Sequence, residues 1–373
     1  MIDRAVEVGD AGSGPLIDPS PETPDASGSL PAHRIDFLDA LRGIAVCFVL
    51  VQHCGERLFG WFHALSINVV QCGQLGVFVF FLCSGFIIPA SLERNGSISR
   101  FWISRFFRLY PMYWLSIALM AILASLGVAI AVGFPLRSWL SNLTMLQLYL
   151  GGGDLNGAFW TLGWELTFYV AVTILFLLGL HRRSVALSIA ASLGCAVGTL
   201  LLTALHHHVP LGAFSLVTMF TGTVAYRFVA NEVSRSTVAA VVGLSLATGS
   251  MMLAVVLIGH EDRAALGLRG FVPMLVAWAG AYAVFFAGLI FWRRRAPQPL
   301  RYVGRVSYSI YLLQGLVIAT IPIIAGAGWL SAAIWVTVTI ALSALSFRLV
   351  ELPSIALGRR IIRGREASRR LAG

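Results

Sequence analysis

The chain has 373 residues, of which 58% are hydrophobic and only 12% are charged, and its mean hydropathy is +0.82. Soluble domains usually carry about a quarter charged residues, so this composition excludes an ordinary soluble protein and indicates an integral membrane protein. The net charge of +10 is a weak argument for nucleic-acid binding, because all 27 basic residues are Arg and they lie between hydrophobic stretches. We expect no nucleic-acid partner.

Composition divides the chain into three regions. Residues 1–33 are rich in Pro, Gly, Ser and acidic residues, and they lack the basic start and apolar core of a secretory signal. We expect a disordered cytoplasmic tail there. Residues 34–353 contain the long apolar stretches and form the expected transmembrane domain, and residues 354–373 are rich in Arg and are expected to form a basic cytoplasmic tail.

Ten apolar stretches are long enough to cross a hydrocarbon core about 30 Å thick. They lie near residues 37–54, 73–92, 109–132, 160–180, 184–205, 211–229, 237–258, 271–291, 305–325 and 329–351. The sequence therefore predicts an all-α, polytopic bundle of about ten transmembrane helices. With the N-terminus inside, the outer loops hold only four arginines, Arg57, Arg137, Arg263 and Arg269. This positive-inside bias predicts cytoplasmic N- and C-termini.

The first stretch contains three ionisable residues, Asp39, Arg42 and His53. A charge in hydrocarbon is costly and usually marks a functional site or an internal pair. Arg42 and His53 are eleven residues apart, which places them on one helix face, roughly 16 Å apart along the axis. Asp39 lies one turn from Arg42 and could fix its guanidinium. His53 is suited to be a general base or a nucleophile, although a structural histidine is an equal alternative.

The second stretch and the inner connection after it carry a candidate anion site. FFLCSGF places Ser84 beside a glycine, where small residues allow helices or a thin cofactor arm to approach. In FWISRFFRLYPMYW, Arg105 and Arg108 share a helix face beside aromatic residues. That pair suits phosphates, whereas ordinary membrane anchoring is the alternative. We expect Ser84, Arg105, Arg108 and Tyr113 to bind a phosphate-bearing cofactor.

The longest outer connection, residues 133–159, could enter the membrane or close over a site. It is followed by WTLGWELTFY, in which Glu165 stands at the start of an apolar stretch with Tyr169 one turn away. The Trp and Tyr residues are expected at any membrane interface. The carboxylate is the informative group, and it could orient a histidine or hold a substrate hydroxyl.

The last two stretches add polar residues to apolar helices. SYSIYLLQ places Ser307, Tyr311 and Gln314 on one stripe, which suits the lining of a cavity or hydrogen bonding between helices. Arg348 and Glu351 are one turn apart and are expected to form a structural ion pair. The cysteines show no CxxC spacing, and His206, His207 and His208 are adjacent residues that do not converge on one metal. We expect no metal site.

These segments, in this order, resemble the membrane-bound acyltransferase family 3, which includes O-acyltransferases of lipopolysaccharide, exopolysaccharide, Nod factors and macrolides. The resemblance covers residues 34 to about 353. Its most specific element is DALRGIAVCFVLVQH, with an Arg, ten residues and a His, followed by FFLCSGF, RFFRLYPMYW, WTLGWELTFY, SYSIYLL and VELP. One such motif is weak evidence, whereas six in order are specific.

The resemblance implies an acyl-coenzyme A donor, probably acetyl-coenzyme A in kind, that enters from the cytoplasm as a co-substrate, with no permanently bound cofactor. It implies a bacterial inner-membrane enzyme whose acceptor is a hydroxyl of a glycan or glycolipid. His53 would be the catalytic histidine, with Arg42 and Glu165 beside it, while Arg105 and Arg108 would contact the donor. Asp39, Tyr169, Ser307, Tyr311 and Gln314 are the expected substrate-binding residues.

One residue departs from the family pattern, because the tyrosine-rich motif usually ends in His and here ends in Gln314. Gln can form hydrogen bonds but cannot exchange a proton near neutral pH. Two other functions stay open. A macrolide or another small molecule could be the acceptor, and a transporter or flippase of a glycan or acylated product could use the same intramembrane charges.

Overall fold

The computed structural model describes residues 33–128, 132–259, 267–293, 295–324 and 328–372. The expected N-terminal tail lies outside these residues, except for His33. The described elements are α1 (His33–Leu58), α2 (Gly60–Asn68), α3 (Cys72–Asn95), α4 (Ile98–Ser125), α5 (Leu136–Leu143), α6 (Gln147–Leu150), α7 (Phe159–Leu177), α8 (Ser184–Ala204), η2 (Leu211–Ala213), α9 (Phe214–Val229), α10 (Arg235–Gly259), α12 (Gly267–Phe291), α13 (Gln298–Thr320), α14 (Gly328–Ser346), η3 (Phe347–Glu351) and α15 (Leu352–Ala372). All of these elements are helical, as predicted.

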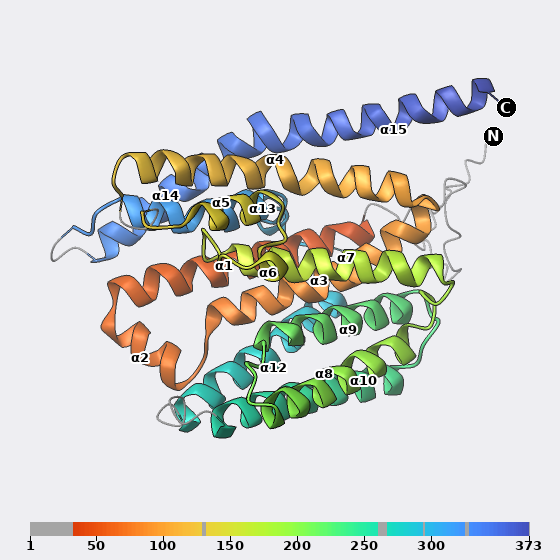
Figure 1. Cartoon of the computed structure of the whole chain (residues 1–373), viewed down its shortest axis with the longest axis horizontal. Helices are drawn as coiled ribbons and strands as arrows, with labels where there is room; N and C mark the ends of the chain where they lie inside the picture. Colours follow the sequence, from red (N-terminus) through yellow and green to blue (C-terminus); the bar gives the residue numbers. More distant parts are fainter. Residues whose placement is uncertain (1–32, 129–131, 260–266, 294, 325–327, 373) are drawn as a thin grey trace, which may run out of the picture.

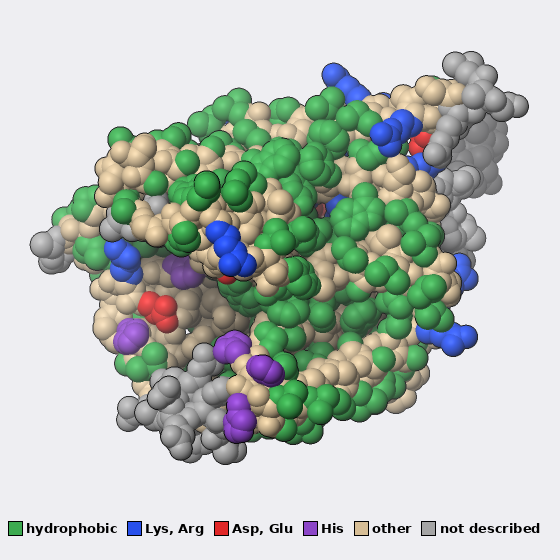
Figure 2. All heavy atoms as spheres, viewed as in Figure 1, with side chains coloured by type: hydrophobic (Ala, Val, Ile, Leu, Met, Phe, Trp, Pro, Cys, Tyr) green, Lys and Arg blue, Asp and Glu red, His purple; other side chains and the backbone are tan. Residues whose placement is uncertain are grey.

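A helix overlaps each of the ten predicted apolar stretches. Eight helices in the described part of the chain are long and apolar enough to cross a membrane by themselves. The other two stretches correspond to α9, with 16 residues, and to α13. Large apolar side chains remain exposed, among them Phe291 at 76% and Trp329 at 72%, and Figure 2 shows hydrophobic side chains spread over one whole face of the molecule. The protein is a polytopic helical membrane bundle.

Helices α1 and α3 form the centre of the bundle (Figure 1). α1 packs against α13 on one side and α3 on the other, and α3 continues the core toward α9 and α12. α8 and α10 pack together beside α9, α14 packs against α13, and α15 lies along α4. The arrangement places the polar residues of α1, α3 and α13 in the interior, where they can enclose a site.

Two glycines allow α1 and α13 to cross at close range. A Cβ added to Gly304 of α13 would lie 1.6 Å from the Asp39 backbone oxygen, and one added to Gly43 of α1 would lie 2.2 Å from the Leu300 backbone oxygen. Both contacts are with backbone, which cannot move aside as a flexible side chain does. Small residues at such crossings are typical of membrane helices.

Gly304→Ala is therefore expected to destabilise the protein, because α1 and α13 must separate to admit one methyl group. Overpacking of this kind usually costs about 1–3 kcal/mol and more against rigid neighbours. Gly243→Ala in α10 is the matched control, since its added Cβ would meet nothing within 4 Å. Thermal unfolding in detergent should show a lower melting temperature for Gly304→Ala alone, and equal melting temperatures would contradict this packing.

The Ser-Gly pair of α3 serves both purposes that its sequence allows. A Cβ on Gly85 would lie 1.9 Å from the Met219 backbone oxygen of α9, so the glycine permits close helix packing. The neighbouring Ser84 points to the other side and lines two interior cavities.

Candidate active site

Two adjoining cavities lie between α1, α3, α4, α7 and α13. The first, here called the arginine pocket, has a volume of about 330 Å³. Its basic lining residues are Arg42, Arg105, Arg108, Arg305 and Arg359. The second, here called the central cavity, has a volume of about 50 Å³ and is lined mainly by residues of α3, α7 and α13. Arg42 and Ser84 line both cavities, so the two spaces meet at these residues.

The arginine pocket has more positive charge than its own carboxylates neutralise. Asp39 is the acidic residue in its lining, and in the described part of the chain no ion pair within 4.0 Å joins Asp39 to Arg42. The Nε atoms of Arg42 and Arg105 are buried and have no hydrogen-bond partner among the described residues. Buried donors without partners are costly, so the pocket is suited to an anion that accepts these hydrogen bonds.

Arg105 is positioned by aromatic rings. Its guanidinium lies 5.6 Å from the ring centre of Phe101 and 6.0 Å from that of Tyr169, and one terminal nitrogen donates a 3.2 Å hydrogen bond to the Ser91 hydroxyl. Stacking on aromatic faces holds an Arg without neutralising it. Arg105 therefore keeps its full charge for a ligand.

Glu165 of α7 connects the two cavities through a short hydrogen-bond chain. Its Oε1 accepts hydrogen bonds from the Ser84 hydroxyl at 2.9 Å and from the Tyr169 hydroxyl at 2.7 Å. Tyr169 is 1% exposed, so this contact fixes the Glu165 rotamer from below. In the structure Glu165 lies near Arg42, with which it shares the lining of the central cavity, rather than next to a histidine.

Arg108 is held by Glu351, which corrects the expected pair of Glu351 with Arg348. Arg108 Nη1 lies 3.3 Å from Glu351 Oε1, and the Ser309 hydroxyl donates to Glu351 Oε2 at 3.0 Å. Arg348 is exposed on the other side. The difference arises because residues 347–351 form a π-helical turn, which changes the direction of Glu351 relative to a regular α-helix.

Arg108→Ala is expected to destabilise the protein by about 3–5 kcal/mol, because it leaves the buried Glu351 without its counter-charge. Arg348→Ala should leave stability unchanged. Thermal unfolding of both variants checks this pairing. A loss with Arg348→Ala, or none with Arg108→Ala, would show that Glu351 is paired otherwise.

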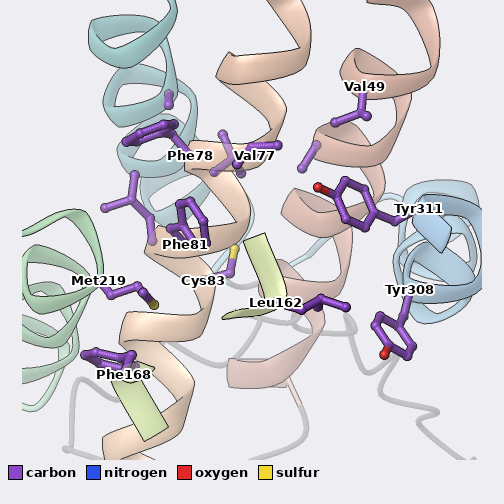
Figure 3. Packing of buried hydrophobic residues seen from close by; sticks show 14 of the residues in the cluster. Val49, Val77, Phe78, Phe81, Cys83, Leu162, Phe168, Met219, Tyr308 and Tyr311 are labelled. Atoms are coloured by element: carbon purple, nitrogen blue, oxygen red, sulfur yellow. The ribbon is translucent and has the colours of Figure 1, made fainter. Parts of the chain in front are cut away.

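The central cavity ends at an aromatic wall. Tyr311 of α13 lies in its lining, forms a 3.0 Å hydrogen bond with the Thr161 hydroxyl, and packs its ring 6.0 Å from the ring of Phe80. Figure 3 shows Tyr311 reaching from α13 toward Val77 of α3. Ser307, also in the lining, is fully buried and its hydroxyl has no partner among the described residues.

His53 lies beyond this wall, one helical turn farther along α1 than Val49. Its side chain is accessible to solvent although protein atoms surround most of it, so it lies in a hollow. Gln314 contacts the imidazole and is itself 1% exposed, while neither atom of its amide has a hydrogen bond of good geometry in the described residues. His53 lines neither the arginine pocket nor the central cavity.

A polar network borders His53 at the junction of α1 and α2. Gln52 donates hydrogen bonds to Glu56 and to the Ser66 hydroxyl, and the Ser66 hydroxyl also donates to Glu56. Figure 2 shows a hollow at this end of the molecule with acidic and histidine side chains at its edge, while the arginines gather mostly toward the opposite end. The two ends of the bundle therefore differ in charge.

The outer connection covers the same end of α13. Asn156 Nδ2 donates a 3.0 Å hydrogen bond to the Leu312 backbone oxygen, and α5 and α6 pack in front of α13 in Figure 1. Asp154 accepts a 3.0 Å hydrogen bond from Gln147 Nε2. Burial raises the pKa of Asp154, and the Gln147 hydrogen bond opposes this shift.

The structure thus brings together Arg42, Ser84, Glu165, Tyr169, Arg105 and Arg108, with Ser307, Tyr311 and Asp39 in the cavity linings. Tyr113 is outside both linings and packs 4.5 Å from the Phe159 ring centre. Sequence reasoning did not assign Tyr308, Arg305 or Arg359 to the site. Tyr308 and Arg305 lie in or next to the SYSIYLLQ motif and could have been found from it. Arg359 is one of several similar arginines near the C-terminus and gave no signal.

Comparison with known proteins agrees with this architecture. The nodulation protein 10 of Rhizobium leguminosarum bv. viciae is 31% identical over 176 residues, covering 40% of this chain and 46% of that protein. The acyltransferase MdmB of Streptomyces mycarofaciens is 26% identical over 146 residues, covering 37% of this chain and 38% of that protein. No solved structure matches the chain.

A third relative is the peptidoglycan O-acetyltransferase OatA of Listeria monocytogenes, 28% identical over 179 residues, which cover 42% of this chain and 27% of that protein. The chain spans less than half the length of each of these curated relatives. The acyltransferase domain that defines the family matches residues 35–349, which include both cavities except Leu352, Ile355 and Arg359. The chain belongs to the acyltransferase family 3.

Proposed function

We propose that the protein transfers an acyl group, acetyl in the simplest case, from acyl-coenzyme A to a hydroxyl of a sugar in a glycan or glycolipid. The observation that carries the proposal is the order of groups along one path: five arginines, a narrow cavity, and a histidine in a hollow at the far end. A phosphate-bearing donor and a hydroxylated acceptor would approach this path from opposite ends.

The arginine pocket matches the charged part of coenzyme A. The donor carries a pyrophosphate and a ribose phosphate, and Arg is the residue best suited to bind phosphate oxygens in pairs. The unpartnered Nε atoms of Arg42 and Arg105 supply donors for those oxygens. The central cavity, at about 50 Å³, admits only a slender group, and the pantetheine arm is the slender part of the donor.

The reaction then needs His53 and the donor thioester to meet. Arg42 and His53 are roughly 16 Å apart along the continuous helix α1, and the Phe80–Tyr311 ring pair lies between them. An extended pantetheine arm can bridge this distance when one of these rings turns aside. The thioester would then lie beside the imidazole.

His53 would act as the general base. It removes the proton from the acceptor hydroxyl, whose oxygen attacks the thioester carbonyl carbon; the C–S bond breaks, and the coenzyme A thiolate leaves and takes up the proton. Gln314 can orient the imidazole through a hydrogen bond but cannot exchange a proton, so the base function rests on His53 alone. A route through an acyl-imidazole would need the same residue as a nucleophile.

The acceptor class follows from the relatives and from the site's far end. The Listeria relative acts, by its name, on peptidoglycan, and the hollow beside His53 is bordered by Gln52, Glu56 and Ser66, whose oxygens and amide can bind sugar hydroxyls. A bacterial inner membrane, with the arginine pocket facing the cytoplasm, is the location that fits the positive-inside bias of the arginines.

The test is release of free coenzyme A from acetyl-coenzyme A by membranes that contain the protein, with a crude glycan extract as acceptor. Release should require both the protein and the extract, and labelled acetyl groups should become attached to the glycan. A transporter would instead move glycan across sealed vesicles without consuming acetyl-coenzyme A, and that result would refute the proposal.

A further inference from the structure

We propose that the C-terminal helix α15 is a wall of the donor site and that its Arg359, together with Arg305 of α13, binds the phosphates of coenzyme A. This inference rests on the proposed function. Arg359 lies beyond the residues that match the family's acyltransferase domain, so the assignment comes from the geometry of this chain.

The lining of the arginine pocket places α15 at the site. Besides Arg359, the pocket is lined by Leu352 and Ile355 of α15 and by Phe347 of the π-helical turn. Residues 352, 355 and 359 are spaced by three and four positions, which puts them on one face of a helix. One continuous face of α15 is therefore directed at the pocket.

The π-helical turn explains how this face reaches the pocket. Residues 347–351 join α14 to α15 without a loop, and a π-turn inserts a residue that rotates everything beyond it. The same turn directs Glu351 to Arg108, 3.3 Å away. Arg108 inside the pocket and Arg359 in its wall are thus positioned by one local feature.

Contacts with α4 hold α15 in place. Arg100 Nε lies 3.0 Å from Glu366 Oε1, and Arg365 Nη1 donates a 3.2 Å hydrogen bond to the Ser99 hydroxyl. Gly358 is buried, and a Cβ there would lie 2.9 Å from Phe107 Cβ, so the glycine allows α15 to lie directly on α4. Arg359 follows this contact point by one residue.

The charges at the pocket mouth are available to a ligand. Neither Arg305 nor Arg359 forms an ion pair within 4.0 Å in the part of the chain that the structure describes; Arg305 lies 6.0 Å from the Tyr302 ring centre. Both side chains are exposed, which is the expected state of arginines that wait for a soluble polyanion. Arg42 and Arg105 would bind the deeper part of the donor, and Arg305 and Arg359 the phosphates nearer the mouth.

Arg360 provides a matched control for Arg359. It is the next residue on α15, carries the same charge and is also exposed, but it does not line the pocket. Neighbouring residues on a helix point about 100° apart. A difference between the two variants therefore reports on direction toward the pocket and not on net charge.

The experiment measures binding of coenzyme A and of pantetheine, which lacks the phosphates, to the full-length protein in nanodiscs. Arg359→Gln should weaken coenzyme A binding about three- to tenfold, as expected for an exposed charge-assisted contact, with pantetheine binding unchanged. Arg360→Gln should bind both like wild type. Arg305→Gln should resemble Arg359→Gln.

The outcomes separate the inference from the proposed function. Wild-type protein that does not bind coenzyme A would refute the proposed donor. Wild-type binding that Arg359→Gln does not weaken, or weakens no more than Arg360→Gln, would overturn the role of α15 alone. Equal weakening of coenzyme A and pantetheine would also overturn it, because Arg359 would then shape the pocket without contacting phosphate.

Discussion

His53→Ala is expected to reduce acyl transfer by about 10²–10⁴-fold, the usual contribution of a general base, while coenzyme A binding stays near that of wild type. The imidazole lies in a solvent-accessible hollow and lines neither cavity. Its removal therefore costs little packing and leaves the arginine pocket intact. The rate of coenzyme A release and the affinity for free coenzyme A, measured on the same membranes, check both parts.

His63→Ala is the control for this prediction, because His63 is an exposed histidine on the neighbouring helix α2. It should transfer at the wild-type rate. Full activity of His53→Ala in protein that inserts and folds normally would remove the histidine from the mechanism.

Arg42→Gln is expected to weaken coenzyme A binding about ten- to a hundredfold, because the residue lines both cavities and its buried Nε has no protein partner. That range corresponds to about 1.4–2.8 kcal/mol, in line with a hydrogen bond to a charged group. The same change should not lower the melting temperature of the free protein, since no ion pair is broken. Coenzyme A should raise the melting temperature of wild type and do so far less for the variant.

Arg42→Lys distinguishes charge from shape at this position. It keeps the positive charge but loses the planar fork that binds two oxygens at once, so intermediate affinity is expected. If Arg42→Gln destabilised the free protein and bound coenzyme A as wild type does, Arg42 would be a structural residue.

The sequence predicted the helical membrane bundle because its main determinant, the length of apolar stretches, is local. The face shared by Arg42 and His53 also follows from helical periodicity along α1, and the structure keeps that helix continuous through both residues. The Glu165 site was found as a carboxylate at the start of a stretch. Its partners Ser84 and Tyr169 became clear only once α3 and α7 were packed together.

Other features depend on contacts between distant segments and could not be read from one chain. Glu351 lies nearer in sequence to Arg348, yet a π-helical turn directs it to Arg108. The Arg-rich segment after residue 354 has the composition of a tail, but residues through Ala372 are helical and Arg359 lines the pocket. Hydrophobic periodicity does not reveal a π-turn, and arginine content does not show which arginine points inward.

The separation of Arg42 from His53 by the Phe80–Tyr311 pair has a functional consequence. While the rings stay together, the arginine pocket and the hollow at His53 are separate spaces, so an acyl donor cannot be hydrolysed by water from the far end. Donor entry would open the passage and deliver the thioester to the histidine. Transfer would thus connect the two sides of the membrane without moving either substrate fully across it.

Sealed membrane vesicles of defined orientation test this central claim most directly. Acetyl-coenzyme A would be added outside inverted vesicles, whose cytoplasmic face is exposed, and outside right-side-out vesicles, with labelled acetyl groups traced to glycan enclosed in the first and added outside in the second. We predict His53-dependent labelling of the glycan in the inverted vesicles and none in the right-side-out vesicles until they are permeabilised. Equal labelling in intact vesicles of both orientations, or labelling in neither after permeabilisation, would contradict a path that receives its donor at the arginine pocket and its acceptor at His53.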